Sequence, residues 1–403
     1  MAIVTSWSCR RDATAAADEA LDGIRAALDA EPDLLLVHTS CNHDVPTIVA
    51  RLQQRVPDVP LHGGTSCLGV MTRSGFHTEE EHGLGLLGIV DPDGGYGAGL
   101  AAADDIGPEE AAVMALERAL AQAGRPGELP AAVLISVYPG HEEHVIQAIE
   151  SHLGASPPIV GGTSADNDMT GQWLQIANGE VAGQAASVAV LFPSGDVGYS
   201  FHSGYEPTSH RGRVTRASER VLHEIDGRPA AHVYDEWTGG VAAPVLGGGS
   251  LVPAATLSPL GRPVWSVSGV PFFRLSYPVE VLQDGSLLVF TDIHEGDEVV
   301  LMTGSVDSLV TRAGRVAAMA VEAAPFRPEE THGAFVLFCA GCMLAVQDRM
   351  PEVVAAIRKE LGDAPFLGVF TLGEQGCFIG GENRHGNLMV AVLAFGPRHM
   401  ERG

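Results

Sequence analysis

The chain has 403 residues, 45% of them hydrophobic, and a formal net charge of −26 at pH 7. This length and apolar content predict a globular protein of two or three domains and exclude an intrinsically disordered chain. The charge argues against nucleic acid or an anionic membrane as the partner, because both attract clustered positive charge.

The first predicted elements form one α-β-α-β-β unit. Apolar residues at helical spacing predict a helix over residues 15–28, and the continuous apolar run at 34–38 predicts a buried strand. A second helical face follows at residues 45–56. The unit ends with the tetrapeptide Gly-Gly-Thr-Ser at residues 63–66 and an apolar strand at 83–90.

A second unit repeats this order. Gly-Gly-Thr-Ser recurs at residues 161–164, and 161 − 63 gives an offset of 98 residues. The same offset carries the apolar run 34–37 onto residues 132–135, and two landmarks at one spacing indicate a duplicated supersecondary unit. The predicted helices are 108–123 and 142–153, and the predicted strands are 132–137, 172–176 and 186–192.

Residues 196–304 interrupt the repeats with many glycines and prolines, a candidate helix at 229–237 and a hairpin turn at Asp284 and Gly285. A third, weaker copy follows, with predicted helices at 306–321 and 350–361 and predicted strands at 334–339, 365–371 and 387–395. The alternation predicts an α/β fold with mixed sheets built from repeated α-β-α-β-β units. We expect two domains packed together, over residues 1–222 and 223–398.

Several short motifs occur in a characteristic order, at residues 63–66, 161–164, 229–237, 273–274, 283–287, 295–297 and 366–374. Together they resemble the FIST family, in which an N-terminal and a C-terminal FIST domain occur in tandem. The resemblance implies a bacterial sensory protein that binds a small ligand such as an amino acid. Some members resemble haem-binding nitric-oxide sensors. The chain has no kinase, cyclase or methyl-accepting segment, so its output would pass through a separate signalling protein.

Polar residues follow several predicted strands, where ligands of α/β proteins gather. The candidate ligand-binding residues of this class are Thr65, Ser66, Thr163, Ser164, Asp166, Asn167, Thr371 and Glu374. Arg274 would clamp a ligand carboxylate if its guanidinium points inward, and the alternative is a structural salt bridge. The paired glycines either bring the backbone close to a ligand or relieve crowding where strands cross. We expect a small polar, amino-acid-like ligand.

Five of the six cysteines fall at or just after predicted strand ends, namely Cys41, Cys67, Cys339, Cys342 and Cys377. Convergence there would build a site for a soft metal or an iron–sulfur cluster, with His38, His43 and His62 as further ligands. Cys339 and Cys342 also fit a redox dithiol between a strand and a helix. Buried cysteine is equally a common core residue.

The remaining features limit the chemistry. Lys359 is the only lysine and lies in a helical pattern, which argues against pyridoxal phosphate and Walker-type nucleotide binding. The sequence has no Cys-x-x-Cys-His motif for covalent haem and no Gly-x-Ser-x-Gly elbow, whereas noncovalent haem stays open.

No apolar run predicts a membrane span, and residues 1–7 lack the features of a signal peptide, so we expect a cytoplasmic protein. The leading hypothesis is a ligand-binding sensor. A cysteine-dependent metal, iron–sulfur or redox enzyme and a haem-based gas sensor are the alternatives, and whether the protein is an enzyme is left open.

Overall fold

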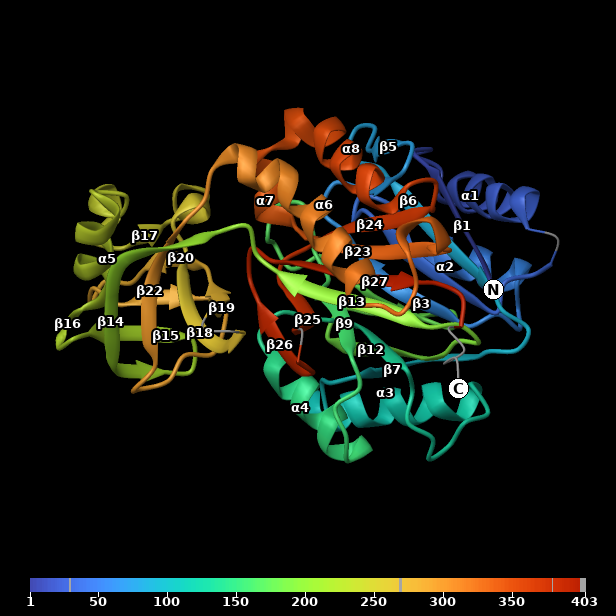
Figure 1. The fold of residues 1–403 in the computed structure, drawn as a ribbon, viewed down its shortest axis with the longest axis horizontal. Coiled ribbons are helices and arrows are strands. Elements are labelled where there is room, and N and C mark those ends of the chain that lie inside the picture. The colour runs from blue at the N-terminus through green and yellow to red at the C-terminus, as the bar shows by residue number, and fades with distance from the viewer. Residues whose placement is uncertain (29, 268–269, 379, 399–403) are drawn as a thin grey trace.

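The structure is a computed structural model that describes residues 1–28, 30–267, 270–378 and 380–398. It confirms a mixed α/β fold with several mixed sheets. Three repeats form a large body, and a smaller unit, inserted into the third repeat, lies at the left of Figure 1.

The first repeat contains the eight elements β1 (Ala2–Ser8), α1 (Ala13–Ala27), β2 (Leu34–Thr39), α2 (Val45–Arg55), β3 (Leu61–Thr65), β4 (Val70–Thr72), β5 (Gly75–His77) and β6 (Leu84–Val90). All six residues of β2 are buried, which explains why this strand is continuously apolar rather than alternating. Strands β2 and β3 run parallel, and α2 crosses between them. The side chain of Asp12 caps α1 by accepting a hydrogen bond from the backbone N–H of Ala15.

The second repeat follows the same order, with β7 (Gly95–Ala102), α3 (Pro108–Gln122), β8 (Ala132–Val137), α4 (Glu142–Leu153), β9 (Ile159–Thr163), β10 (Gln175–Ala177), β11 (Glu180–Ala182) and β12 (Ala185–Phe192). Its central pair, β8 and β9, is also parallel and fully buried. The duplication predicted from the 98-residue offset is confirmed.

The third repeat is interrupted but has the same layout. It contains β13 (Val197–His202), α6 (Val306–Glu322), β23 (Gly333–Cys339), α7 (Ala340–Ala345), α8 (Met350–Leu361), β24 (Phe366–Thr371), β25 (Glu374–Phe378), β26 (Glu382–Gly386) and β27 (Val390–Phe395). Strands β23 and β24 are its parallel central pair. The short α7 and the 3-10 turn at Gln347–Arg349 precede α8 and lengthen this crossover.

The three repeats exchange hairpins in a cycle. The hairpin β10–β11 of the second repeat extends the first sheet beside β3, and β25–β26 of the third extends the second sheet beside β9. The hairpin β4–β5 of the first repeat closes the cycle beside β24. Each sheet therefore depends on a neighbouring repeat for its edge, and the carboxyl ends of the three central strand pairs meet in the middle of the body.

The paired glycines lie where these sheets cross. A Cβ atom on Gly64 would collide with the hydroxyls of Ser136 and Ser164, and one on Gly162 would collide with Thr371. The relief of crowding is therefore a sufficient reason for these glycines.

The inserted unit, between β13 and α6, is built on one twisted sheet. It contains β14 (Glu206–Ser218), β15 (Val221–Ile225), β16 (Arg228–Pro229), α5 (Ala230–Thr238), β17 (Gly249–Ser250), β18 (Leu260–Val267), β19 (Val270–Ser276), β20 (Pro278–Val281), β21 (Leu287–Val289) and β22 (Glu298–Thr303), with 3-10 turns at Ala243–Val245 and Ala254–Leu257. The expected hairpin is β20–β21, and Gly285 in its turn has a φ of +81°. Residue 222 lies within β15, and the division of the chain there stays a prediction.

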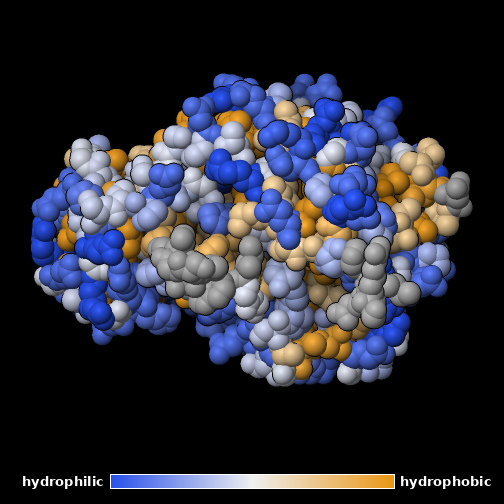
Figure 2. Space-filling model, in the orientation of Figure 1, coloured by the Kyte–Doolittle hydropathy of each residue, from blue (hydrophilic) through white to orange (hydrophobic). Residues whose placement is uncertain are grey.

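The visible surface is mainly hydrophilic, in keeping with the charge of −26. Figure 2 shows this most clearly over the inserted unit, where hydrophobic side chains appear only in small patches. Among the described residues, no helix is both long and apolar enough to cross a membrane.

Candidate functional site

The hairpin exchange brings the predicted strand-end hydroxyls together. Thr65, Ser66, Thr163, Ser164 and Thr371 are all buried at the ends of β3, β9 and β24. Backbone hydrogen bonds join these ends between repeats, from Ala165 N to Thr65 O at 3.0 Å and from Leu372 N to Thr163 O at 3.0 Å. The fold thus brings these residues close together, while their role in ligand binding stays a prediction.

Most of these hydroxyls are occupied by hydrogen bonds within the protein. Ser66 Oγ accepts from Phe370 N at 2.8 Å and donates to Gly69 O at 2.6 Å, which ties the first repeat to the third. Thr65 Oγ1 accepts from Leu174 N at 3.0 Å, and Ser164 Oγ lies 2.9 Å from Ser136 Oγ. These hydrogen bonds hold the central strand ends in place.

The two predicted polar residues after β9 shape a loop. The carboxylate of Asp166 accepts hydrogen bonds from the backbone of Met169, Gly171 and Gln172 at 2.7 to 2.9 Å. Asn167 accepts from Leu68 N at 2.8 Å. Both side chains therefore set the path of the β9–β10 connection.

Glu374 is fully buried beside Thr371. Thr371 Oγ1 donates to one carboxylate oxygen at 2.7 Å, and Met389 N donates to the other at 2.9 Å. Burial raises the pKa of Glu374 to about 8, because these two hydrogen bonds and the attraction of Arg312 only partly offset the loss of water. Glu374 is consequently an internal, protonated acid at neutral pH.

A buried ion-pair cluster lies where the second repeat, the third repeat and the inserted unit meet. Arg220, in the turn between β14 and β15, reaches Glu142 and Glu143 in the first turn of α4. Its Nη2 is 2.6 Å from Glu142 Oε2 and 2.7 Å from Glu143 Oε2, and its Nε is 3.0 Å from Asp292 Oδ1. Two acids at a helix N-terminus also interact favourably with the helix dipole.

The pKa values in this cluster follow from its charges. Burial opposes the charged form of Glu143, but attraction to His385, Arg220 and Arg274 outweighs it and lowers the pKa of Glu143 to about 2. Burial likewise opposes the charge of Arg220, yet Glu142 and Glu143 raise its pKa. Arg220, together with His385 and Arg274, therefore keeps Glu143 ionised.

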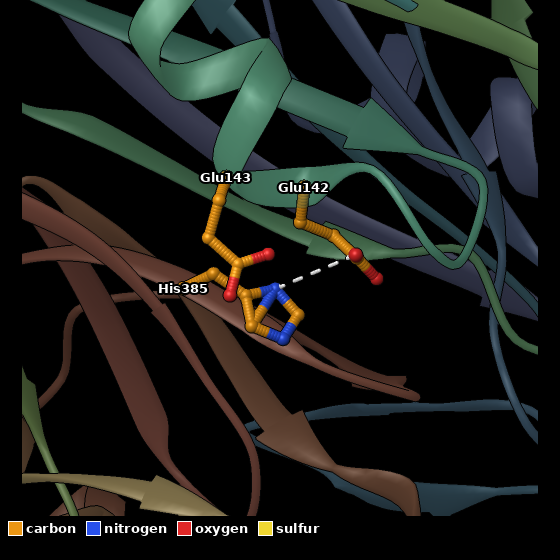
Figure 3. Close-up of side chains that lie close together, drawn as sticks. All are labelled: Glu142, Glu143 and His385. Carbon is orange, nitrogen blue, oxygen red and sulfur yellow. Dashed lines mark ion pairs between the residues drawn. The ribbon is translucent and has the colours of Figure 1, made fainter. Parts of the chain in front are cut away.

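His385 on β26 faces the two glutamates of α4, as Figure 3 shows. Its Nδ1 is 4.0 Å from Glu142 Oε2 and 3.3 Å from Gln375 Nε2, and its Nε2 is 3.3 Å from Asn387 Nδ2. Burial lowers the pKa of His385, against the attraction of Glu143 and Glu142. The ring is thus held by amide groups on both sides.

The geometry of Glu142, Glu143 and His385 resembles a metal site, since their ligand atoms lie within 4.8 Å of one another. The position of Arg220 argues against a metal ion at this site. Its guanidinium touches both carboxylates, so a metal ion in the same triangle would face a buried positive charge at close range. These three residues do not fit a metal ion, and the occupied ring nitrogens of His385 do not fit an axial haem ligand.

A small pocket of about 90 Å³ opens on one side of the cluster. Its lining residues are Pro139, Glu142, Thr163, Met169, Trp173, Arg220, Phe290, Leu372 and Asn387. The walls are mainly apolar, and the predicted residue Thr163 donates from the floor to Glu142 Oε1 at 2.9 Å. This pocket suits a compact apolar group.

A larger polar groove of about 310 Å³ lies against the same cluster. Its lining residues are Glu143, Ile146, Gln147, Glu150, Arg274, Asn383, Arg384 and His385. Arg274, from β19, enters this groove from the inserted unit, whereas α4 and β26 belong to the second and third repeats.

Arg274 has weak contacts for a buried guanidinium. Its side chain is only 14% exposed, yet the nearest carboxylate oxygen, of Glu143, is 3.9 Å away. It donates to Asp292 O over a long distance of 3.4 Å. Burial and repulsion from Arg262 lower the pKa of Arg274 to about 9, which the attraction of Glu143 does not offset. Of the two roles weighed for Arg274, a tight structural salt bridge is absent from the described residues.

The cysteines do not form one set. Cys339 and Cys342 lie close to each other, and Cys41 lies near Cys67. Cys377 is elsewhere, beside Tyr199. Among the described residues, the only group of three or more such ligands is the one on Glu142, Glu143 and His385. His38 and His62 are buried, and burial lowers their pKa values to about 4 and about 3.

Sequence reasoning missed Glu142, Glu143, Arg220, Asp292 and His385. The acidic pair directly after the loop at residues 138–141 was a usable signal, because acids favour the first turn of a helix. Arg220, Asp292 and His385 lie in turns or at a sheet edge, where no periodic pattern identifies them.

Comparison with known proteins gives one strong family match and several weak likenesses. An uncharacterised protein of Methanocaldococcus jannaschii, MJ1623, is 38% identical over 95 residues, which is 24% of this chain and 18% of that protein. The chain thus matches less than a fifth of that relative's length.

Two solved structures resemble the fold over nearly the whole chain, but weakly. Cyanuric acid hydrolase from A. caulinodans has 10% identity and a TM-score of 0.36, and covers 99% of each chain. T. maritima PurL complexed with ADP has 10% identity and a TM-score of 0.21, over 98% of this chain and 71% of that one. Neither likeness supports a conclusion here.

The family match covers most of the chain. The FIST N domain matches residues 33–228, and the FIST C domain matches residues 230–377 directly after it. Both halves occur in the order expected from the motifs. The chain belongs to the FIST family of sensory, ligand-binding domains.

Proposed function

We propose that the protein is a cytoplasmic sensor that binds a small, amino-acid-like ligand in the polar groove beside α4. Arg274 receives the ligand carboxylate. The observation that carries the proposal is the guanidinium of Arg274, which is buried, lines the groove and, among the residues that the structure describes, has no carboxylate oxygen closer than 3.9 Å.

A carboxylate in the groove would complete the contacts of Arg274. Burying a charge is costly unless the charge is paired and hydrogen-bonded, and the depressed pKa of Arg274 reflects that incomplete pairing. A carboxylate offers two oxygens to the planar guanidinium and forms two parallel hydrogen bonds. Arg384 lines the same groove and adds a second positive charge.

The groove also carries acids for a ligand ammonium group. Glu150 and Glu143 lie on its α4 wall, and Glu150 accepts a hydrogen bond from Asn383 Nδ2 at 2.8 Å. Positive and negative groups in one groove favour a zwitterion over a simple acid or amine. The volume of about 310 Å³ is at the lower end for small-ligand sites.

The position of the groove fits a sensory role. Its walls come from two repeats and from the inserted unit, so a ligand in the groove contacts all three parts at once. A separate signalling protein would respond to the occupied groove, and the proposal specifies no partner beyond that class.

Calorimetric titration of the purified protein tests the proposal. The panel contains amino acids and, for each, the amide that lacks the carboxylate and the acid that lacks the amine. We expect heat with at least one amino acid and weaker binding of both derivatives. Arg274→Gln should lose roughly 10- to 100-fold in affinity, since a hydrogen bond to a charged group contributes about 1.5–3 kcal/mol.

The matched control is Arg211→Gln, because Arg211 is an exposed arginine of the same inserted unit whose side chain is 64% exposed. It should bind like the wild type. An amino acid that binds Arg274→Gln as tightly as the wild type contradicts the role of Arg274, and a panel without heat contradicts the ligand class.

A further inference from the structure

Two buried cysteines and a buried arginine form a second chemical centre, outside the groove. Cys339 ends β23 and Cys342 lies in α7, with two residues between them. Both side chains are buried, and they lie close enough for each to shift the pKa of the other. Thiols three positions apart at the start of a helix are close enough to join in a disulfide after a small movement.

Arg312, from α6, supplies the positive charge of this centre. It is fully buried, and its Nη1 donates to Leu388 O at 2.8 Å. Its Nε and Nη2 have no hydrogen-bond partner among the described residues. The guanidinium carbon lies 4.6 Å from the ring centre of Phe338. A buried guanidinium without a paired carboxylate needs another anion nearby.

The groups around Arg312 leave one candidate for that anion. Tyr205 and Cys339 keep their protons, because burial and neighbouring groups raise their pKa values, and Glu374 is largely protonated at neutral pH. Burial also opposes a charge on Cys342, but the hydrogen bond from Cys339 and the attraction of Arg312 prevail and lower its pKa to about 6. The thiolate of Cys342 is therefore the counter-charge.

We propose that Cys339 and Cys342 form a reversible dithiol–disulfide site that reacts with a small neutral peroxide. The thiolate sulfur of Cys342 attacks one oxygen of hydrogen peroxide and breaks the O–O bond, and the leaving hydroxide takes a proton to become water. The sulfur of Cys339 then attacks the resulting sulfenic sulfur and displaces hydroxide, which takes the Cys339 proton as a second water. Two thiols and one peroxide thus become one disulfide and two waters.

The structure also selects the cysteines and the oxidant. Burial and nearby acids raise the pKa of Cys9 to about 11 and that of Cys67 to about 12, so neither is a reactive thiolate at neutral pH. Burial raises the pKa of Cys377 to about 12 as well. Since Cys339 and Cys342 are buried, a bulky charged disulfide such as glutathione disulfide cannot reach them without unfolding.

Oxidation of Cys339 and Cys342 would alter contacts of the inserted unit. Cys342 Sγ lies 3.5 Å from Tyr205 Oη, and Tyr205 Oη donates to Thr256 O at 2.7 Å. Thr256 Oγ1 lies 2.9 Å from Tyr277 Oη, in the strand connection next to β20. A disulfide removes the thiolate, so Tyr205 loses a charged neighbour and Arg312 loses its counter-charge.

Thiol counting by mass spectrometry tests the proposal. The full-length protein is treated briefly with hydrogen peroxide at neutral pH, quenched, unfolded and alkylated. We expect a mass lower by two hydrogens and four alkylated cysteines instead of six (6 − 2), with a crosslink between Cys339 and Cys342, and recovery of six after dithiothreitol. Glutathione disulfide should leave all six free over the same time.

Variants and pH separate this site from general oxidation. Cys342→Ser and Cys339→Ser should lose the intramolecular crosslink, whereas Cys377→Ser, which removes another buried thiol, should keep it. The rate of crosslinking should reach half its maximum near pH 6. This pH profile tests for the Cys342 thiolate without any substitution at Arg312. Six free thiols after peroxide, a crosslink between other cysteines, or half-maximal rate near the usual thiol pKa of about 8.5 would each overturn the proposal.

Discussion

Replacing Arg220 by glutamine should destabilise the protein strongly and in a pH-dependent way. Glutamine keeps much of the side-chain length but removes the charge that faces Glu142, Glu143 and Asp292 at 2.6, 2.7 and 3.0 Å. Three buried or half-buried carboxylates would then share only Arg274, which is 3.9 Å from the nearest of them. An uncompensated buried charge is among the most destabilising changes in a folded protein.

Two estimates give a similar magnitude. Lowering the pKa of Glu143 from 4.5 to about 2 corresponds to about 3 kcal/mol of the free energy of unfolding, which Arg220 supplies together with His385 and Arg274. Breaking a buried ion pair by removing one partner typically costs about 3–5 kcal/mol. At roughly 1–2 °C per kcal/mol for a chain of this size, the melting temperature should fall by about 3–10 °C.

The sign of the pH dependence follows from the lowered pKa. A carboxyl whose folded pKa is depressed stabilises the fold above its unfolded pKa of about 4.5, and that contribution is lost as pH falls through about 2. In Arg220→Gln, Glu143 binds a proton more readily, so acid relieves its unpaired charge. The difference between variant and wild type should therefore be largest near pH 7 and shrink below about pH 4.5.

Differential scanning calorimetry at pH 7 and pH 4 measures both effects. Arg211→Gln is the control, because its exposed pair with Glu298 at 3.5 Å should contribute less than about 1 kcal/mol. If Arg220→Gln melts like this control at pH 7, or if its deficit grows in acid, the account of the cluster is refuted.

Two further predictions concern the centre of the body. Gly162→Ala should lower the free energy of unfolding by about 1–3 kcal/mol, because the new Cβ would collide with Thr371 and Leu337. Gly247→Ala is the control and should leave the free energy of unfolding unchanged, because the space around Gly247 is open. Urea denaturation measures both variants. Glu374→Gln mimics the protonated acid. Because the folded pKa of Glu374 is raised, its contribution to stability is fully present below about pH 4.5 and is lost as the pH rises towards 8. The urea midpoint of the variant should therefore equal that of the wild type near pH 5 and exceed it above pH 8. A variant less stable than the wild type at high pH would contradict this protonation state.

The repeats were predictable because their central strands are buried on both faces. Strands β2, β8 and β23 are continuous apolar runs, and such runs survive duplication as visible sequence patterns. The hairpin exchange was not predictable. The exchanged strands β4, β5, β10 and β11 have three residues each. Three residues are too few to show a periodic pattern, so the sequence does not indicate which strand of another repeat they pair with.

The candidate site was predictable only in part. Strand-end hydroxyls such as Thr163 do lie at the ends of strands, but their hydrogen bonds go mostly to the protein itself. Arg220, Asp292 and His385 are brought to the site from distant segments through tertiary contacts. Arg274 was identifiable because a charged residue in an apolar strand-like run is unusual.

The structure of the protein with a bound amino acid tests the central claim most directly. We predict electron density for the ligand in the groove, with its carboxylate oxygens within hydrogen-bond distance of the Arg274 guanidinium and its ammonium group near Glu150 or Glu143. Density in the small apolar pocket beside Trp173, or anywhere without contact to Arg274, would contradict the claim.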